Sequence, residues 1–180
     1  MMKKNWKTLS STPVLSFGKW LNVEDRTVET PSGQVIEHWA WVQIQDYINV
    51  LAVTEDNHFV VFRQGKYGLD GESLAPVGGY IEPGEEPLAA AKRELLEEAG
   101  YEAAEWVPLG QFLVDPNRGV ARGFLYLARH ARRVAEPDSD DLEEQQLLLM
   151  ERAELASALK DGQFKVLAWA ANVALALLQE

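Results

Sequence analysis

The sequence predicts an α/β protein, in which helices cover the faces of a mixed β-sheet. Three observations lead to this class. Short apolar and β-branched runs dominate the first half of the chain, a strong helix pattern follows near the middle, and strand-like runs then give way to two helical segments. With 180 residues, 47% of them hydrophobic, the chain is long enough for one domain with a substantial core.

The predicted strands come first along the chain. Residues 35–44 (VIEHWAWVQI), 48–53 (INVLAV) and 59–63 (FVVFR) are rich in the β-branched and aromatic residues that favour strands. The turn-like TEDNH between the second and third runs predicts that these two strands pair as a hairpin. A glycine-containing loop is expected at residues 65–73.

A helix is predicted from about Pro87 to Ala99. Pro87 suits the first helical position, because its missing N–H would have no partner there. Glu85 and Glu86 lie at the same end, where the helix dipole favours negative charge. The alanines and leucines that follow are strong helix formers, and Gly100 tolerates the left-handed conformation that ends many helices.

After this helix the pattern returns to strands and ends in helices. We expect strands at 106–114, 123–128 and 147–150, and helices at 151–162 and 166–178. The loop 115–122 separates the first two of these strands, and an acidic loop at 136–145 precedes the third. The apolar run 166–178 is interrupted by Asn172 and falls short of the ~20 residues that a membrane span needs. We therefore interpret it as a buried or dimer-facing helix.

The helix at 87–99 carries three glutamates on one face. Glu94 is followed by Glu97 at a spacing of three residues and by Glu98 at a spacing of four, and both spacings bring side chains together. Like charges at these spacings destabilise an isolated helix by ~0.2–0.5 kcal/mol per pair. A bound cation would reverse that sign, whereas the alternative interpretation is a solvated acidic face.

The surrounding residues favour the cation. The stretch 79–101 reads G, five residues, E, seven residues, R-E, an apolar residue, any residue, E-E, any residue, G and an apolar residue. The matching positions are Gly79, Glu85, Arg93, Glu94, Leu95, Glu97, Glu98, Gly100 and Tyr101. Seven of them demand one residue type, which chance would supply on the order of once in 10⁸ starts. On this pattern the chain resembles the Nudix hydrolase superfamily.

This resemblance implies the Nudix α/β/α sandwich, with a mixed sheet and an N-terminal β extension. Nudix proteins mostly hydrolyse a nucleoside diphosphate linked to another group, using a divalent metal. The clustered negative charge of a diphosphate repels a water nucleophile. Mg²⁺, for which Mn²⁺ can substitute, takes oxygen ligands and can polarise a phosphoryl oxygen, neutralise the leaving group and generate hydroxide.

The resemblance also implies roles for individual residues. The implied metal ligands are the carboxylates of Glu94, Glu97 and Glu98 and the main-chain carbonyl of Gly78. Arg93 and Glu85 would hold the ligating carboxylates in place, as metal sites usually require. A late carboxylate that orients or deprotonates the attacking water is expected at Glu143 or Glu144, with a solvated acidic loop as the alternative.

Outside the motif, the chain is most similar to the ADP-ribose pyrophosphatase branch. VFRQGK resembles the R-Q-x-R stretch of that branch, with Lys66 at the second arginine, and Pro116 stands where the branch commonly has a proline. The chain departs from the branch in APVGG, residues 75–79, where E-L-P, a small residue and G are usual, and in NRGVAR after Pro116. The implied preferred substrate is ADP-ribose, cleaved to AMP and ribose 5-phosphate, with another nucleoside diphosphate sugar or a dinucleotide as the alternative.

Six further residues are candidates for substrate contacts. Trp39, Trp41 and Tyr47 can stack on a base, a contact that contributes ~1–3 kcal/mol. Packing in the core of a strand is the alternative for each of them. Arg63, Lys66 and Arg118 can bind phosphate or ribose, or can simply be solvated cations.

Composition excludes several other classes. The net charge of −11 and the sequence pI near 4.8 argue against non-specific nucleic-acid binding, which depends on Lys and Arg. The absence of cysteine excludes disulfides, thiolate metal sites and cysteine nucleophiles, and it fits a reducing cytoplasm. The two lysines near the start are not followed by an apolar run, so no signal peptide is predicted.

We expect residues 1–45 to form the β extension, with a role in dimerisation, and residues 46–180 to form the Nudix domain. The two would act as effectively one domain. A homodimer is expected because the branch often builds its site from two subunits. A nucleotide-sensing module without catalysis is the alternative from another class. The complete motif, and the lack of a basic helix-turn-helix segment after it, favour the enzyme.

Overall fold

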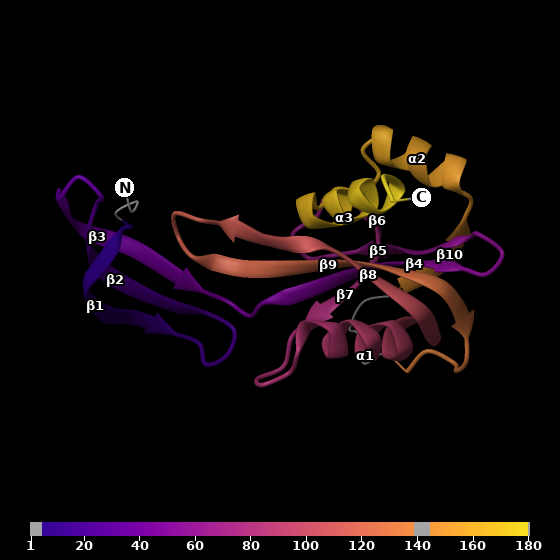
Figure 1. The fold of residues 1–180 in the computed structure, drawn as a ribbon, viewed down its shortest axis with the longest axis horizontal. Helices are drawn as coiled ribbons and strands as arrows, with labels where there is room; N and C mark the ends of the chain where they lie inside the picture. Colours follow the sequence, from indigo (N-terminus) through magenta and orange to yellow (C-terminus); the bar gives the residue numbers. More distant parts are fainter. Residues whose placement is uncertain (1–4, 139–144, 180) are drawn as a thin grey trace. The chain divides into compact units, whose positions relative to one another are not determined.

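A mixed central sheet between two layers of helices makes up most of this protein, in a computed structural model that describes residues 5–138 and 145–179 (Figure 1). The strands are β1 (Lys7–Ser16), β2 (Asn22–Glu29), β3 (Val35–Gln43), β4 (Tyr47–Thr54), β5 (Phe59–Gly65), β6 (Glu72–Ala75), β7 (Val77–Tyr80), β8 (Tyr101–Asp115), β9 (Val120–Arg133) and β10 (Gln145–Met150). The helices are α1 (Pro87–Ala99), α2 (Arg152–Lys160) and α3 (Leu167–Leu177).

The central sheet has the strand order β10-β5-β4-β9-β8 over the described residues, with β6 paired to β5 and β7 paired to β4. β4 and β9 run parallel, whereas β4 pairs antiparallel with β5 and β7. The sheet is therefore mixed, as predicted. The predicted hairpin joins β4 to β5, and the amide of Thr54 donates to the carbonyl of His58 at 2.9 Å across its turn.

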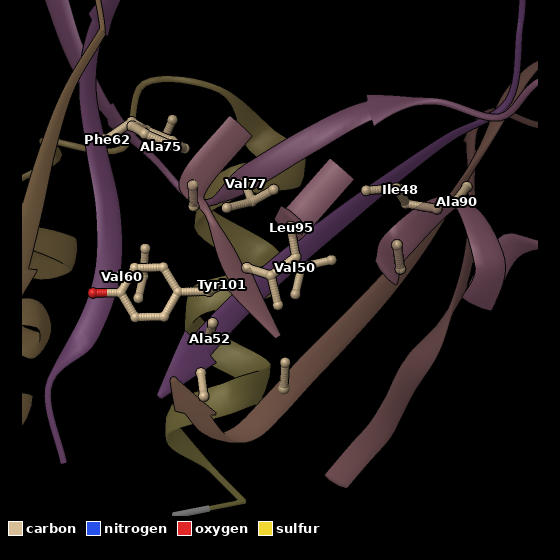
Figure 2. Packing of buried hydrophobic residues seen from close by; sticks show 14 residues of the cluster. Ile48, Val50, Ala52, Val60, Phe62, Ala75, Val77, Ala90, Leu95 and Tyr101 are labelled. Atoms are coloured by element: carbon tan, nitrogen blue, oxygen red, sulfur yellow. The ribbon is translucent and has the colours of Figure 1, made fainter. Parts of the chain in front are cut away.

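Helices cover both faces of this sheet, which confirms the α/β/α arrangement. Side chains of β4 alternate between the two layers, as successive residues of a strand must. Ile48, Val50 and Ala52 pack in one cluster with the buried residues of α1, such as Leu95 (Figure 2). Leu51 and Val53 pack in the other cluster, with α2 and α3. In the apolar run 166–178, α3 buries Val173 and Ala176 against the sheet, as one of the two interpretations expected, whereas the dimer-facing role stays a prediction.

The strands β6 and β7 were not predicted, and the expected loop 65–73 is wrong at Gly65, which ends β5, and from Glu72 onward, where β6 begins. β4 and β5 pair only at Ala52–Val60 and Val53–Phe59. Elsewhere β4 pairs with β7, and β5 pairs with β6. Each new strand has only four residues, and β7 reads VGGY, a glycine-rich sequence with little strand propensity.

The chain divides into two compact units. One comprises Tyr47–Gln111 and Gly123–Glu180, and holds the central sheet with its helices. The other comprises Met1–Asp46 and Phe112–Arg122, and its strands β1, β2 and β3 form a three-stranded antiparallel sheet. The strands β1 and β2 were not predicted individually, and the predicted division into 1–45 and 46–180 stays a prediction. No helix in the described part of the chain combines the length and the apolar character needed to cross a membrane.

Candidate metal-binding active site

The helix α1 positions the three glutamates, and its limits agree with the prediction. Pro87 occupies its first turn, and Gly100 ends it in the left-handed conformation at φ 73°. The amide of Gly100 donates to the carbonyl of Leu96 at 2.9 Å, which satisfies one of the last carbonyls of the helix. Ala91 and Leu95 are buried against the sheet. The glutamates therefore lie on the side of α1 that the core does not use.

Arg93 is the centre of the site. Its Nε and Nη2 donate to the two oxygens of Glu85, both at 3.0 Å. Its Nη1 donates to Glu94 at 2.7 Å and to Glu97 at 3.1 Å. Nη2 also donates to the main-chain carbonyl of Tyr80 at 3.2 Å. All five N–H groups of the guanidinium thus have an acceptor, so Arg93 determines the positions of three carboxylates at once.

The three carboxylates that accept hydrogen bonds from Arg93 differ in their exposure to solvent. The side chains of Glu94 and Glu85 are 13% and 17% exposed, whereas that of Glu97 is 49% exposed. Burial raises the pKa of Glu94, because its neighbour Arg93 offsets only part of the lost hydration. The hydrogen bonds from Arg93 lower the pKa of Glu85, and those same bonds raise the pKa of Arg93.

Gly79 brings the carboxylate of Glu94 close to the backbone of β7. A Cβ atom at this position would lie 2.1 Å from the carboxyl carbon of Glu94, a distance that real Cβ atoms do not reach. The first glycine of the motif is thus explained by sterics, because only a residue without a Cβ lets the partly buried carboxylate of Glu94 lie directly on the strand.

The edge of β7 that is turned away from β4 faces the same group. The amide of Gly78 donates to Glu98 at 3.3 Å, so it is not used in pairing with Asn49, the residue opposite on β4. In an antiparallel pair the N–H and C=O of one residue point the same way, and therefore the Gly78 carbonyl also points away from β4, toward the side where Glu98 lies. The carbonyl of Tyr80, two residues on, points the same way and accepts from Arg93.

This donor set fits a hard divalent cation such as Mg²⁺, because it consists of carboxylate and carbonyl oxygens. In the described part of the chain no three acidic or histidine side chains are gathered closely enough to hold a metal as they stand. The reason is visible in the contacts, since Glu94 and Glu97 turn to Arg93 while Glu98 turns to Gly78. The exposed Glu97 can swing from Arg93 most easily, and Arg93 would then still be held by Glu85.

In the larger unit, which holds the central sheet, the predicted substrate-contact residues lie at different places. Tyr47 begins β4, opposite Tyr80, and its ring lies over the Cα of Gly123. Arg63 is exposed on the sheet face that α2 and α3 cover, since it alternates with Phe62 of the α1 face. Lys66 follows β5 directly.

Glu143 and Glu144 lie outside the described residues. The described residues on either side of that segment can be placed. The amide of Asp138 donates to the carbonyl of Glu97 at 2.8 Å, and Gln145 pairs with Gln64 at the end of β5.

The other three candidates, Trp39, Trp41 and Arg118, belong to the smaller unit and lie close together within it. Trp39 and Trp41 line a cavity of about 360 Å³ together with Trp6, Arg26 and Asn117, among other residues. The indole N–H of Trp39 donates to the carbonyl of Asn117 at 2.8 Å, and its ring lies 5.5 Å from that of Trp6. The guanidinium of Arg118 lies 5.5 Å from the Trp39 ring, and that of Arg26 lies 4.2 Å from the Trp41 ring. Trp39 and Trp41 are half-buried rather than part of the core.

Sequence reasoning missed Trp6, Arg26 and Tyr80. Trp6 and Arg26 approach Trp39 and Trp41 only through the pairing of β1, β2 and β3, which no local pattern reveals. Tyr80 stands at a position where the motif allows any residue, so only its place on the β7 edge singles it out.

Comparison with known proteins agrees with this geometry. The model of the NUDIX domain matches residues 45–170. The methanol dehydrogenase activator of Bacillus methanolicus is 30% identical over 123 residues, covering 68% of this chain and 65% of its own. The ADP-ribose pyrophosphatase of Bacillus subtilis (strain 168) is 28% identical over 154 residues, covering 86% of this chain and 81% of its own. The ADP-sugar pyrophosphatase of Mus musculus is 33% identical over 113 residues, covering 56% and 51%.

The chain thus spans just under two thirds of the first of these relatives and about half of the third. Among solved structures, an ADP compounds hydrolase superposes with a TM-score of 0.78 over 97% of this chain and 94% of its own, at 20% identity. That likeness concerns the fold.

Proposed function

This chain belongs to the Nudix hydrolase family, and from that premise we propose that it hydrolyses the diphosphate bond of a nucleoside diphosphate sugar with the help of Mg²⁺. ADP-ribose is the preferred substrate, and the products are AMP and ribose 5-phosphate. The observation that carries the proposal is that Glu94 and Glu97 accept hydrogen bonds from Arg93 while Glu98, on the same helix, accepts from the Gly78 amide of β7. The names of two relatives, an ADP-ribose pyrophosphatase and an ADP-sugar pyrophosphatase, support the substrate class.

Glu94, Glu97, Glu98 and the Gly78 carbonyl would hold the metal, for which Mn²⁺ is a substitute. When bound, a divalent cation supplies charge neutralisation at the phosphates and lowers the pKa of water. Arg93 and Glu85 keep the carboxylates oriented, because a bidentate pair resists rotation better than a single contact. Partial burial of Glu94 strengthens its attraction for a cation, since the surrounding dielectric is low.

In the reaction, the oxygen of a water forms a bond to one phosphorus, and the bond from that phosphorus to the bridging oxygen breaks. The water loses its proton to a carboxylate, for which we propose Glu143 or Glu144. Each product leaves as a phosphate monoester. The flanking residues support this choice, because Asp138 is bonded to the backbone of Glu97 and Gln145 pairs at the end of β5.

We propose that the tryptophan cavity of the smaller unit, lined by Trp39 and Trp41, binds a nucleobase by stacking. Trp6 joins the predicted Trp39 and Trp41 there, and cations stand beside both predicted rings. Arg63, Lys66 and Arg118 are proposed to contact phosphate or ribose, and Tyr47 to contact the nucleotide within the larger unit.

A cytoplasmic homodimer is part of the proposal. β1 lies at the edge of its sheet, and an uncovered edge strand readily pairs with another chain. Apolar side chains on and beside this strand are exposed, namely Leu9, Val14, Leu15, Phe17 and Trp20. Sedimentation of a clean monomer at micromolar concentration would contradict the dimer.

The function is tested with a panel of ADP-ribose, other nucleoside diphosphate sugars and dinucleotides, with products separated by chromatography. Wild type, Glu98→Gln and the control Glu102→Gln are each assayed with Mg²⁺ and with EDTA. We expect metal-dependent turnover of ADP-ribose by wild type and Glu102→Gln, and its loss in Glu98→Gln. Binding of ADP-ribose without turnover of any panel member would instead indicate a sensor.

A further inference from the structure

The C-terminal end of α1 is an unfavourable place for the carboxylates that it carries. Residues 96–99, which form its last turn, read LEEA, so Glu97 and Glu98 lie at the negative pole of the helix dipole. These two glutamates and Glu94 also repel one another at spacings of three and four residues. In addition, the last carbonyls of a helix have no partner within it. This turn therefore needs support from another part of the chain.

The segment that follows β9, residues 134–138, supplies this support at the end of α1 (Figure 1). The amide of Asp138 donates to the carbonyl of Glu97 at 2.8 Å. The amides of Val134 and Ala135 donate to the carbonyl of Gly100, at 2.8 and 3.2 Å. We call residues 134–138 the strap. All of its residues are exposed, so main-chain hydrogen bonds rather than burial of side chains hold it to α1.

Gly100 lets the strap come this close. A Cβ atom at this position would lie 2.2 Å from the carbonyl oxygen of Ala135 and 3.0 Å from its carbonyl carbon. These are main-chain atoms, which cannot turn aside as the end of a flexible side chain can. The left-handed backbone, at φ 73°, does not by itself demand glycine, because asparagine also ends helices in this conformation. The collision with the strap explains why glycine alone fits at this position.

We propose that the strap is a positioning element of the metal site, and that Gly100 is the residue that admits it. The inference rests on the proposed function. The strap fixes the main chain of Glu97, and the carboxylates of Glu97 and Glu98 can keep one arrangement around a cation only if the turn that bears them is fixed. Gly100 and Asp138 thus act on the metal through Glu97, and neither of them needs to touch it.

The helix α2 offers a matched comparison within the same chain. Gly162 lies just after α2 and has φ 70°, almost the value of Gly100. A Cβ atom at Gly162 would meet no atom within 4 Å. A substitution at Gly162 therefore shows the effect of the left-handed backbone alone, whereas the same substitution at Gly100 adds the collision with the strap.

The test measures Mg²⁺ affinity by calorimetry, and thermal unfolding, for wild type and for alanine and asparagine variants at both glycines. Gly162→Ala should unfold at a lower temperature than wild type, because alanine is strained at this φ, but it should keep the wild-type Mg²⁺ affinity. Gly100→Ala and Gly100→Asn should both bind Mg²⁺ about 10–100-fold more weakly, the range for loss of a group that orients metal ligands. Asparagine should recover the stability lost at Gly162, but it should not recover the Mg²⁺ affinity lost at Gly100.

A second pair of variants tests the strap without changing Gly100, in case its variants do not fold. Asp138→Pro removes the N–H that donates to Glu97, whereas Asp138→Ala keeps it. Asp138→Pro should therefore weaken Mg²⁺ binding more than Asp138→Ala does. Equal Mg²⁺ affinities in these two variants would overturn the proposal. Wild-type affinity in Gly100→Asn, or an equal loss in Gly162→Asn, would overturn it as well.

The proposed function can fail separately from this inference. If wild type binds Mg²⁺ but hydrolyses no nucleoside diphosphate sugar or dinucleotide, the proposed function fails, and the Mg²⁺ affinities of the variants still decide the role of the strap. If wild type hydrolyses ADP-ribose, kcat/KM at a fixed low Mg²⁺ concentration should fall in the same variants that lose Mg²⁺ affinity. A wild-type kcat/KM in those variants would contradict the role of the strap while leaving the proposed function intact.

Discussion

Replacing Gly79 by alanine should damage catalysis far more than folding. The added Cβ would lie 2.1 Å from the carboxyl carbon of Glu94, whereas carbon atoms in contact are about 3.5–4.0 Å apart. The backbone of Gly79 is not in the left-handed region, so alanine causes no strain in the strand itself. The strain is relieved when the flexible end of the Glu94 side chain moves away by more than about 1 Å.

The expected loss of kcat/KM follows from that displacement of the Glu94 carboxylate. A misplacement of about 1 Å in a catalytic group costs on the order of 10²-fold in rate, and Glu94 is a proposed metal ligand. Overpacking costs about 1–3 kcal/mol in a rigid core, and we expect the lower end here because a side-chain terminus can give way. Gly79→Ala should thus lower kcat/KM about 100-fold and unfold within a few degrees of wild type.

The assay is ADP-ribose hydrolysis at saturating Mg²⁺, with thermal unfolding of the same samples. Gly68→Ala is the matched control, because a Cβ at Gly68 would meet no atom within 4 Å and its backbone is likewise unstrained. If Gly79→Ala kept the wild-type kcat/KM, the claim that catalysis depends on the position of the Glu94 carboxylate against β7 would be refuted. An equal loss in both variants would refute the steric explanation.

Three further predictions follow from the same contacts. Arg93→Lys keeps the positive charge but has three hydrogen-bond donors instead of five, so kcat/KM should fall about 10–100-fold. An unchanged kcat/KM would show that the carboxylates need no such support. Hydrogen bonds from Arg93 lower the pKa of Glu85 in the folded state, so the folded state binds this proton less readily. The stabilisation that is present above the unfolded-state pKa of Glu85 should therefore be lost as the pH falls through the lower, folded-state pKa. Urea unfolding of wild type and Glu85→Gln should therefore differ at pH 7 and converge in acid, and a difference that grows in acid would reverse the assigned sign. Trp39→Ala should raise KM for ADP-ribose about tenfold, because a lost stacking contact costs ~1–3 kcal/mol. An unchanged KM would mean that the base does not stack on this ring.

The extent of α1 and the grouping of its glutamates could be predicted because their signals are local. Pro87, Gly100 and the spacing of Glu94, Glu97 and Glu98 all lie within one short stretch. The full set of Arg93 partners could not be derived from spacing, since Tyr80 and Glu85 approach it only when β7 packs beside α1. Their meeting depends on where the chain turns between Tyr80 and Pro87.

The strands β6 and β7 were missed because two four-residue strands, one with consecutive glycines, are too short for a periodic pattern. They form because β4 and β5 separate and leave open edges, which is a tertiary cause. The tryptophan cavity was likewise only half predicted. Trp39 and Trp41 are conspicuous in sequence, whereas Trp6, Arg26 and Asn117 join them through contacts between distant segments.

The most direct test of the central claim is a titration of Mg²⁺ into chelator-treated protein, with metal binding measured by calorimetry and ADP-ribose hydrolysis measured in the same samples. The account predicts that the rate rises with metal occupancy in wild type. It also predicts that Glu98→Gln loses both metal affinity and rate, while Glu102→Gln retains both. Hydrolysis that proceeds without metal, or metal binding that is unaffected by Glu98→Gln, would contradict it.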